Sequence, residues 1–253
     1  MSAPLLAGRT AVVTGGANGI GAATARVLAA AGAERGAVLD LREALAQAEV
    51  PAGWSAVPVD LRDAGHTARA FETVRDALGT VDVLVAAAGI VPLWTGIESM
   101  DLGEWDAVLD VNARGVLCSM QGALPAMSRD GAIVVIASQN AWRGSAVLPA
   151  YAASKHAVLG LVRSAALELG PRGIRVNAVG PGSVATDAYR ARLARRESEQ
   201  GPPVAEALAR DAGFTALQRL ATADEVANGV LFLASPLASG VTGHVLPVGA
   251  WVT

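Results

Sequence analysis

Short runs of β-branched and other apolar residues alternate along the chain with longer, alanine-rich stretches. The short runs predict strands at 10–14, 37–39, 56–59, 81–85, 132–137, 175–179 and 244–248. The longer stretches predict helices at 19–31, 42–48, 64–78, 103–127, 151–169 and 223–233. Strands that alternate with helices are joined by right-handed crossovers into a parallel sheet. The pattern therefore predicts one α/β domain over residues 1–253, with a parallel sheet of about seven strands flanked by helices.

The stretch 183–213 interrupts this alternation of strands and helices. It is rich in charged residues, has a helical pattern, and is broken by Gly201, Pro202 and Pro203. Long insertions in compact domains often form lids or binding loops. We therefore predict a substrate lid at 183–213. A pair of solvated surface helices would have the same composition, and the sequence does not choose between the two.

Composition and charge exclude several classes of protein. Apolar residues make up 52% and charged residues 17% of the 253 residues, which is typical of a folded chain. The net charge of −3 provides no basic surface for nucleic acid. No apolar run approaches the ~20 residues that a membrane span needs, and the first residues show no export signal. The single cysteine, Cys118, fits a small buried residue in a reducing compartment, so we expect a cytoplasmic protein without a metal site.

A glycine-rich turn is the first candidate for chemistry. The stretch RTAVVTGGANGIGAATARVL runs from an apolar strand into a helix. Glycines at 15, 19 and 21 allow a tight turn and close approach to a pyrophosphate, and the helix adds unpaired N–H groups. The spacing is G-x-x-x-G-x-G rather than the commoner G-x-G-x-x-G, and a plain strand-to-helix turn also uses glycine. The reading is strengthened by Asp40, which ends the second strand 19 residues after Gly21.

Asp40 also indicates which dinucleotide binds. A carboxylate at this distance from the glycines accepts a hydrogen bond from the ribose 2′-hydroxyl of NAD and repels the 2′-phosphate of NADP. Asn18 adds no cation beside the turn, and Arg42 is the one candidate that would favour NADP. We therefore predict NAD as the cofactor, with NADP as the less favoured one. Asp40 would also suit the N-cap of the next helix, and both roles are compatible.

A tyrosine and a lysine form the second candidate. The chain has 20 Lys and Arg residues, of which Lys155 is the only lysine, and it follows Tyr151 by four positions. Residues four apart share one face of a helix, so the hydroxyl and the ammonium can point into the same cleft. A nearby ammonium, together with a positively charged nicotinamide, would lower the pKa of the phenol and make it a usable base. Ser138 ends an apolar strand at the ligand-binding edge of the sheet, where its hydroxyl can hold a substrate oxygen.

The motifs together resemble those of the classical short-chain dehydrogenase/reductase family. The matching segments are TGGANGIG, DVNARG, IVVIAS, YAASK, RVNAVGPG and FLASPLASGVTGHVLPV. The resemblance implies a Rossmann-type, doubly wound sheet of seven strands and a homo-oligomer, commonly a tetramer. It implies that Tyr151 is the general acid/base and that Lys155 lowers its pKa and binds the nicotinamide ribose. It further implies that Ser138 orients the substrate oxygen and that Asn112 holds a water that relays protons to Lys155.

The same resemblance implies a set of cofactor contacts along the strand ends. Asp60 would lie beside the adenine ring with Leu61 after it, and Val184 and Thr186 would engage the nicotinamide carboxamide and the phosphate. Read without the family, Asp60 would be a turn former. The complete predicted set is Gly15, Asn18, Gly19, Ile20, Gly21, Asp40, Leu41, Asp60, Leu61, Ala87, Gly89, Tyr151, Lys155, Pro181, Gly182, Val184 and Thr186.

Two segments depart from the family pattern. The usual Asn-Asn-Ala-Gly after the fourth strand is here Ala86-Ala87-Ala88-Gly89, so an amide that braces the central strands is missing. The usual Val-Asp-Gly-Gly near the C-terminus is here VGAW, at 248–251, which puts the standard subunit contacts in doubt. Neither change removes a catalytic group.

The substrate pocket can be predicted only by position. Residues after Ser138, after Gly89 and within 183–213 are expected to line it; they include Trp94, Trp142, Val147, Leu148 and Tyr189. No pair of convergent charges is obvious, so we predict a mainly apolar secondary alcohol or its ketone. The arginines at 190, 192, 195 and 196 would suit an anionic substrate, but their spacing is more typical of a solvated helix face.

Three functions are consistent with the sequence. The first is an NAD-dependent alcohol dehydrogenase or carbonyl reductase that acts on a small molecule. The second is an NADPH-dependent 3-ketoacyl-thioester reductase, against which Asp40 and Asn18 argue. The third is a non-catalytic nucleotide-binding protein, for which an intact Asn-Ser-Tyr-Lys set has no use. The sequence favours the first.

Overall fold

The computed structural model describes residues 4–250. Seven parallel strands form one sheet in the order β3-β2-β1-β4-β5-β6-β7, which confirms the predicted fold class. β1 is fully buried, as expected for a strand that is covered on both faces. The strands are β1 Thr10–Thr14, β2 Arg35–Asp40, β3 Trp54–Pro58, β4 Val81–Ala86, β5 Met127–Ile136, β6 Arg175–Pro181 and β7 Val245–Val248.

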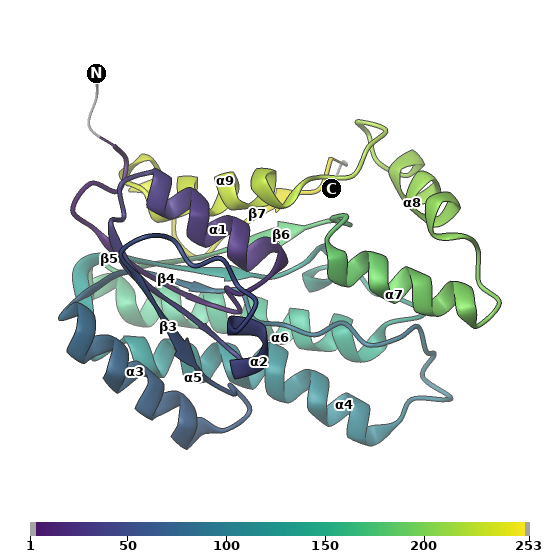
Figure 1. The fold of residues 1–253 in the computed structure, drawn as a ribbon, viewed down its shortest axis with the longest axis horizontal. Coiled ribbons are helices and arrows are strands. Elements are labelled where there is room, and N and C mark those ends of the chain that lie inside the picture. Colours follow the sequence, from purple (N-terminus) through teal and green to yellow (C-terminus); the bar gives the residue numbers. More distant parts are fainter. Residues whose placement is uncertain (1–3, 251–253) are drawn as a thin grey trace.

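Helices cover both faces of the sheet (Figure 1). α1 and α9 pack together on one face, and α3, α5 and α6 cover the other. The helices are α1 Gly19–Ala30, α2 Arg42–Leu45, α3 Ala64–Leu78, α4 Leu102–Leu109, α5 Gly115–Ala123, α6 Pro149–Leu169, α7 Asp187–Ser198, α8 Val204–Gly213 and α9 Ala223–Ala234. Shorter helical turns occupy η1 Asp110–Arg114, η2 Gln139–Ala141, η3 Gly170–Arg172 and η4 Pro236–Ala238. No helix within the described residues is long and apolar enough to cross a membrane.

The sheet separates two hydrophobic cores. Along β1, Val12 belongs to the core under α3, α5 and α6, whereas its neighbours Ala11 and Val13 belong to the core under α1 and α9. Side chains of a strand point alternately to the two faces, so an uninterrupted apolar run supplies both cores. This is why the strands could be found in the sequence as continuous apolar runs.

A carboxylate ties three strands together at the edge where they begin. Asp82, at the start of β4, accepts hydrogen bonds from the Thr10 backbone at 2.9 Å, from Ser128 at 2.8 Å and from Arg9 at 2.9 Å. Burial alone would raise the pKa of Asp82, but these hydrogen bonds outweigh it and hold the pKa below its usual value. The cluster fixes the ends of β1 and β4 opposite to the edge that carries the candidate site.

The prediction of one helix over 103–127 was wrong in two respects. The segment is divided into α4 and α5 by the π-helical turn η1, in which Gly115 N–H donates to the Asp110 carbonyl. A π turn holds an extra residue, which re-aims its side chains, and it often occurs at functional sites. The helix also ends at Ala123, because Met127 already pairs with Val81 as the first residue of β5.

The segment 183–213 forms two helices, α7 and α8, that lie beyond one end of the sheet (Figure 1). The break at 201–203 separates them, as the sequence predicts. The Tyr189 hydroxyl in α7 donates a hydrogen bond to Asp211 in α8, so the two helices are joined by a polar contact as well as by packing. We refer to α7 and α8 together as the lid, after the role predicted for them from the sequence; that role stays a prediction.

Candidate active site

All strands of a parallel sheet end at the same edge, and β1 ends there in the glycine-rich turn. Gly15 and Gly19 have φ values of +67° and +54°, a conformation that favours glycine. A Cβ on Gly15 would lie 2.4 Å from the Ala88 backbone, and one on Gly21 would lie 1.9 Å from the Gly15 carbonyl oxygen. The backbone is therefore packed as closely as the motif requires. A Cβ on Gly19 would meet only the Thr186 methyl group, at 3.5 Å, so this side of the turn stays open.

The first turn of α1 faces that open side. Asn18 is its N-cap residue, is exposed, and makes no side-chain capping hydrogen bond. The N–H groups of a first helical turn have no partners within the helix, and they carry the positive end of its dipole. Glycines without side chains and unpaired amides fit the pyrophosphate of a dinucleotide.

Asp40 lies beside this turn and is held in place. Its Oδ2 accepts a hydrogen bond from Ala17 N–H at 3.0 Å, and its Oδ1 accepts one from Leu41 N–H at 2.8 Å. The N-cap residue of α2 is Leu41, so Asp40 braces the glycine turn instead of capping the next helix. A carboxylate has about four acceptor sites, which leaves two for ribose hydroxyls. Arg42 is exposed at the surface.

Tyr151 and Lys155 share one face of α6, as the four-residue spacing predicts. The helix begins at Pro149, an N-terminal position that suits proline. Lys155 is only 3% exposed, and its Nζ donates to the Ile136 carbonyl at the end of β5, at 2.9 Å. Nζ also lies 5.6 Å from the centroid of the Tyr151 ring. Loss of water around the ammonium lowers the pKa of Lys155 from 10.5 to about 8.

The environment of Tyr151 differs from the sequence expectation. Burial raises the pKa of Tyr151, while a hydrogen bond with Ser138 and the positive charge of Arg192 act to lower it. The net direction in the chain alone is upward, and Lys155 is not one of the groups that lower the pKa. The Lys155 ammonium is directed to the Ile136 carbonyl, below the ring, which accounts for the difference.

Asn112 connects the loop after β4 to α6. Its Oδ1 accepts from Ile90 N–H at 2.7 Å, and its Nδ2 donates to the Ile90 carbonyl at 2.9 Å and to Ser154 at 3.1 Å. The Ser154 hydroxyl in turn donates to the Tyr151 carbonyl at 2.7 Å. Asn112 is fully buried, and the π turn η1 positions it. Ser154 was missed in the sequence, although its place three residues after Tyr151 puts it near the same helical face.

Gly89 opens the space next to these groups. A Cβ at this position would lie 3.2 Å from Asn112 Oδ1 and 3.6 Å from Lys155 Nζ. The absence of a side chain therefore keeps the approach to the ammonium free. Ala87 N–H donates to the Thr14 carbonyl at 3.0 Å. The Thr14 hydroxyl, fully buried, is the one side-chain polar atom among the buried described residues without a hydrogen-bond partner. It lies beside the strand where the sequence lacks the family's bracing amide.

The remaining predicted cofactor residues follow the order of the strands along the edge. Asp60 follows β3 and pairs with Arg62 at 2.6 Å, an interaction that holds the pKa of Asp60 low. Beyond β6, Gly182 N–H donates to the Val248 carbonyl at 3.2 Å, and Val184 forms a bridge with Ala221. Thr186 caps α7. The structure thus brings these positions to one edge of the sheet. Leu61 is buried against Gly115. The positions at the ends of strands or helices are Ile20, Leu41 and Pro181.

Four of the five predicted pocket residues, all except Trp142, share one neighbourhood. Arg192 in α7 stacks on the rings of Trp94 and Tyr189, at 4.1 Å and 5.3 Å from their centroids. The Trp94 loop contacts the segment before Leu148, because Thr95 N–H donates to the Val147 carbonyl at 2.9 Å. Trp142 does not join this group: its ring lies over Gly180 and lines a separate hollow beside His244 and Pro247.

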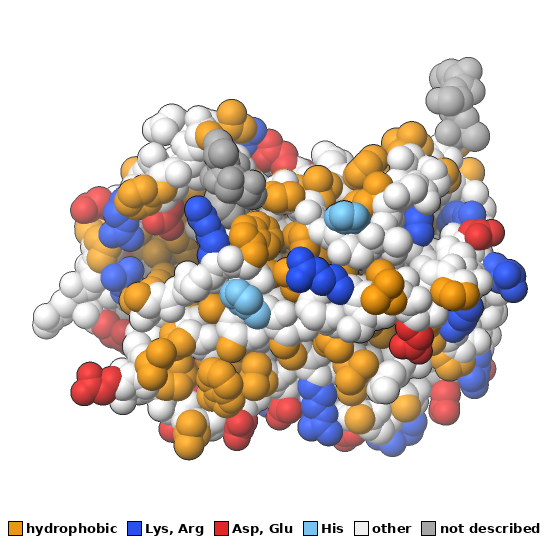
Figure 2. All heavy atoms as spheres, turned by 180° about the vertical axis from the view of Figure 1, so that it is seen from behind, with side chains coloured by type: hydrophobic (Ala, Val, Ile, Leu, Met, Phe, Trp, Pro, Cys, Tyr) orange, Lys and Arg blue, Asp and Glu red, His pale blue; other side chains and the backbone are white. Residues whose placement is uncertain are grey.

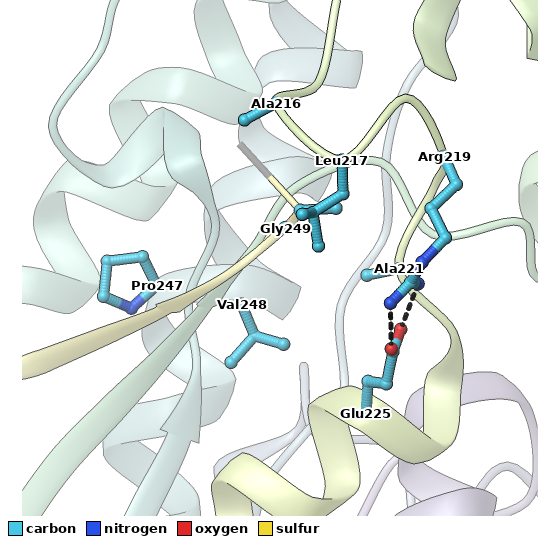
Figure 3. Close-up of a pocket in the computed structure, with 9 residues that line it drawn as sticks. Ala216, Leu217, Arg219, Ala221, Glu225, Pro247, Val248 and Gly249 are labelled. Atoms are coloured by element: carbon cyan, nitrogen blue, oxygen red, sulfur yellow. Dashed lines mark hydrogen bonds and ion pairs between the residues drawn. The ribbon is translucent and has the colours of Figure 1, made fainter. Parts of the chain in front are cut away.

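The lid is anchored where it rejoins the fold (Figure 3). Between β7 and α9 lies a hollow of about 360 Å³, whose rim includes Leu217, Arg219 and Glu225. Arg219 pairs with Glu225 at 2.6 Å and lowers the pKa of Glu225 to about 2. Glu225 also completes the capping box of α9 with Thr222. This hollow shares none of its lining with the Tyr151 group; it marks the fixed end of the lid.

The altered C-terminal segment contributes to the same anchor. Leu217 N–H donates to the Ala250 carbonyl at 2.9 Å. Ala250 has a φ of +59°, in the region where glycine is favoured. The backbone therefore keeps the conformation that the family's usual glycine would adopt. Trp251, the last residue of the altered segment, lies outside the described residues.

Comparison with known proteins gives consistent similarities over nearly the whole chain. The model of a family described as enoyl-(acyl carrier protein) reductase matches residues 15–250. The chain is 38% identical to a (+)-cis,trans-nepetalactol synthase of Nepeta racemosa, over 96% of this chain and 92% of that protein. It is 35% identical to a short-chain dehydrogenase/reductase of Pyricularia oryzae, over 98% of this chain and 93% of that protein.

Two further similarities concern a dehydrogenase and a solved structure. The chain is 38% identical to the cis-4-hydroxycyclohexanecarboxylate dehydrogenase of Sinomonas cyclohexanicum, over 97% of this chain and 96% of that protein. The ligand-free aldohexose dehydrogenase of Thermoplasma acidophilum superposes with a TM-score of 0.86 at 33% identity, covering 98% of this chain and 94% of that one.

The burial of Lys155 predicts that its replacement stabilises the chain. A pKa held at about 8 in the folded chain and 10.5 in the unfolded one corresponds to about 3 kcal/mol at neutral pH. In Lys155→Met this cost disappears, while the Ile136 carbonyl loses its partner at a cost of about 1–2 kcal/mol. We expect a net gain of about 1–2 kcal/mol at pH 7 for the cofactor-free protein, measured by urea unfolding.

The pH dependence distinguishes this effect from simple packing. Below pH 8 Lys155 is charged in both the folded and the unfolded chain, so the folded chain bears the full cost of burying the ammonium. Between pH 8 and 10.5 the folded chain has lost a proton that the unfolded chain keeps. The wild type therefore becomes more stable relative to the variant across this range. The advantage of Lys155→Met should therefore shrink across this interval. Arg163→Met, which removes an exposed cation from α6, is the control and should show no such trend. A Met variant less stable than the wild type at every pH contradicts the prediction.

Proposed function

Because the chain belongs to the classical short-chain dehydrogenase/reductase family, we propose that it is an NAD(H)-dependent oxidoreductase that interconverts a secondary alcohol and its ketone. The family implies a nicotinamide cofactor, and the open glycine turn and the unpaired amides of α1 fit one. The single observation that carries the proposal is the convergence of Tyr151, Lys155 and Ser138 at the end of the sheet where that turn lies.

The chain's own residues supply the proton chemistry. A bound nicotinamide would accept or supply the hydride at the carbinol carbon. In the oxidative direction Tyr151 takes the proton of the substrate hydroxyl, and in the reductive direction it returns that proton to the carbonyl oxygen. Ser138, which is buried and hydrogen-bonded with Tyr151, orients the same oxygen and stabilises the charge that develops on it. Lys155 holds the cofactor ribose and supplies a positive charge beneath the phenol.

The relatives support an oxidoreductase without identifying its substrate. One is named for a hydroxycyclohexanecarboxylate, one for an aldohexose, and one as a synthase whose name includes no oxidation. The predicted walls of the cleft, Trp94, Leu148 and Tyr189, are large and mainly apolar. We therefore propose a mainly apolar secondary alcohol, for which a ring fits the flat aromatic wall.

The second candidate is an NADPH-dependent 3-ketoacyl-thioester reductase. The description of the matching family model, an acyl carrier protein reductase, favours it. The fixed carboxylate of Asp40 argues against it, because it would face the 2′-phosphate of NADPH. Cofactor preference therefore separates the two candidates.

We also propose a homo-oligomer, a tetramer by family resemblance, that works in the cytoplasm. Apolar side chains at the surface, such as Leu167, which is 83% exposed, and Leu237, which is 64% exposed, would be covered by subunit contacts. Light scattering of the purified protein should give a mass of about four chains of 25.5 kDa. A monomeric mass contradicts this part of the proposal.

Removing one hydroxyl tests the proton transfer. Tyr151→Phe keeps the ring that packs over Lys155 but removes the group that carries the proton. We expect turnover of a secondary alcohol, followed by the absorbance of NADH, to fall by about 10²- to 10⁴-fold. NADH binding and the melting temperature should stay close to those of the wild type, which shows that the site is intact. Undiminished turnover would refute the mechanism. NADH binding with no turnover of any alcohol in the wild type would favour a non-catalytic protein.

Replacing Asp40 tests the choice of cofactor. The wild type should prefer NAD over NADP in kcat/KM by about 30-fold or more, since a charge-assisted hydrogen bond is lost and a repulsion gained with NADP. Asp40→Asn removes the charge and can still accept one of the two backbone hydrogen bonds, so the preference should fall by about tenfold or more. Glu43→Gln, which removes an exposed charge three residues away, should leave the preference unchanged. A wild type that prefers NADP would contradict the assignment of NAD as the cofactor.

A further inference from the structure

Arg192 occupies an unusual position for a charged side chain in this structure. It projects from α7 and is half-buried, with its guanidinium 4.1 Å from the centroid of the Trp94 ring and 5.3 Å from that of Tyr189. One of its nitrogens, Nη1, donates to the Pro92 carbonyl at 3.3 Å. Stacking on a flat ring fixes the plane of a guanidinium and leaves its edge donors free to act. The side chain is thus held in one orientation.

The positive charge of Arg192 has no matching anion at ion-pair distance within residues 4–250. Eight other arginines do pair with a carboxylate there. The charge of Asp211 acts to raise the pKa of Arg192, but this carboxylate is already bonded to the Tyr189 hydroxyl and lies 3.7 Å from Arg210. Burial lowers the pKa of Arg192, which is the expected sign of a desolvated cation that is not fully compensated.

A second arginine increases this excess of positive charge. The guanidinium of Arg196 lies 4.8 Å from the centroid of the same Trp94 ring. The two cations repel each other, and the repulsion also lowers the pKa of Arg192. Two guanidinium groups held on one indole without a carboxylate between them are destabilising unless an anion joins them. The geometry therefore has a place for an anion that the described chain does not supply.

This place belongs to the cleft in which the chemistry is proposed. The positive charge of Arg192 lowers the pKa of Tyr151, so the two groups lie within electrostatic range of each other. The Trp94 loop is attached to the segment before α6 by the hydrogen bond from Thr95 to Val147. Seen from behind, the end of the molecule that carries the lid is hollowed, with hydrophobic side chains inside and both cationic and acidic side chains around them (Figure 2). A substrate whose alcohol reaches Tyr151 would extend past Arg192.

We propose that the substrate is a secondary alcohol, or its ketone, that carries a carboxylate on the side remote from the reacting carbon, and that Arg192 binds this carboxylate. The inference rests on the proposed function, whose substrate it specifies. The planar fork of a guanidinium matches the two oxygens of a carboxylate. Arg196 adds a second positive charge, and Trp94 provides the flat wall against which an apolar ring between the two polar ends would pack. Binding the carboxylate would also hold α7 over the substrate.

A matched pair of alcohols tests the proposal. The pair is cis-4-hydroxycyclohexanecarboxylate and its methyl ester, which differ in charge but present the same carbinol. We expect the wild type with NAD to favour the acid in kcat/KM, and Arg192→Gln to reduce kcat/KM for the acid by about 10- to 100-fold more than for the ester. Any loss shared by both alcohols reports the influence of Arg192 on Tyr151, so only the ratio of acid to ester counts.

The control replaces an arginine on the same helix. Arg190 is exposed, so Arg190→Gln removes the same charge from α7 without changing the cleft, and it should leave the ratio of acid to ester unchanged. A ratio that is the same in the wild type and in Arg192→Gln, with both alcohols oxidised, overturns the inference while the proposed function stands. Equal effects of the two glutamine variants would overturn it as well, since they would reflect net charge.

A binding measurement separates failure of the inference from failure of the proposed function. Cyclohexanecarboxylate carries the anion but no hydroxyl, so it cannot be oxidised at a carbinol. Titrated calorimetrically into the protein, with and without NADH, it should bind the wild type at least about tenfold more tightly than Arg192→Gln. If no alcohol is oxidised but this difference is seen, the proposed function fails and Arg192 still binds a carboxylate. If the two proteins bind it equally, the inference fails whatever the turnover.

Discussion

The arrangement of the candidate site depends on taking one ammonium group out of water. Lys155 is buried beneath Tyr151, and within residues 4–250 its Nζ donates only to the Ile136 carbonyl. This one hydrogen bond does not offset the full cost of desolvation. Its surroundings are built around this charge: Gly89 provides no side chain that would block it, and Asn112 fixes the neighbouring loop to α6. An arginine would bring a larger, branched group into the same space, so a chain that otherwise uses arginine has its only lysine here.

Without a bound cofactor, burial favours the neutral forms of both Tyr151 and Lys155. Burial raises the pKa of the phenol and lowers that of the ammonium to about 8, so each side chain is shifted toward its neutral form. A phenolate and an ammonium formed together would stabilise each other, because attraction is strong where water is excluded. Ser138 and Arg192 already favour the phenolate. Ionisation of the phenol therefore depends on nearby positive charge, which is the property that a group exchanging protons with a substrate needs.

The sequence predicted the features that depend on local pattern and missed those that depend on distant partners. All seven strands were found because each contains a short run of apolar residues, although the polar first residues of β5 were missed. Tyr151 and Lys155 were found because their spacing fixes a helical face. The π turn at Asn112 was missed; the partners that hold the Asn112 side chain, Ile90 and Ser154, are 22 and 42 residues away in the sequence. Arg192 was read as a solvated surface residue, because helix α7 has no apolar stripe and the ring that covers the side chain is that of Trp94, on a distant loop.

The predicted cofactor residues are held more firmly than the lid. This difference affects which positions can change among members of the family. The cofactor residues lie at the ends of paired strands whose cores are packed on both faces, so their positions are fixed by the whole sheet. The lid begins at the α7 cap Thr186, is followed by the segment that leads to Thr222, the N-cap of α9, and is joined internally by the contact of Tyr189 with Asp211. Substitutions in the lid disturb few other contacts. The group that we propose for substrate recognition, Arg192, can therefore change while the proton chemistry is preserved. This agrees with relatives that are 38% identical to this chain over nearly its whole length and have names that refer to different compounds.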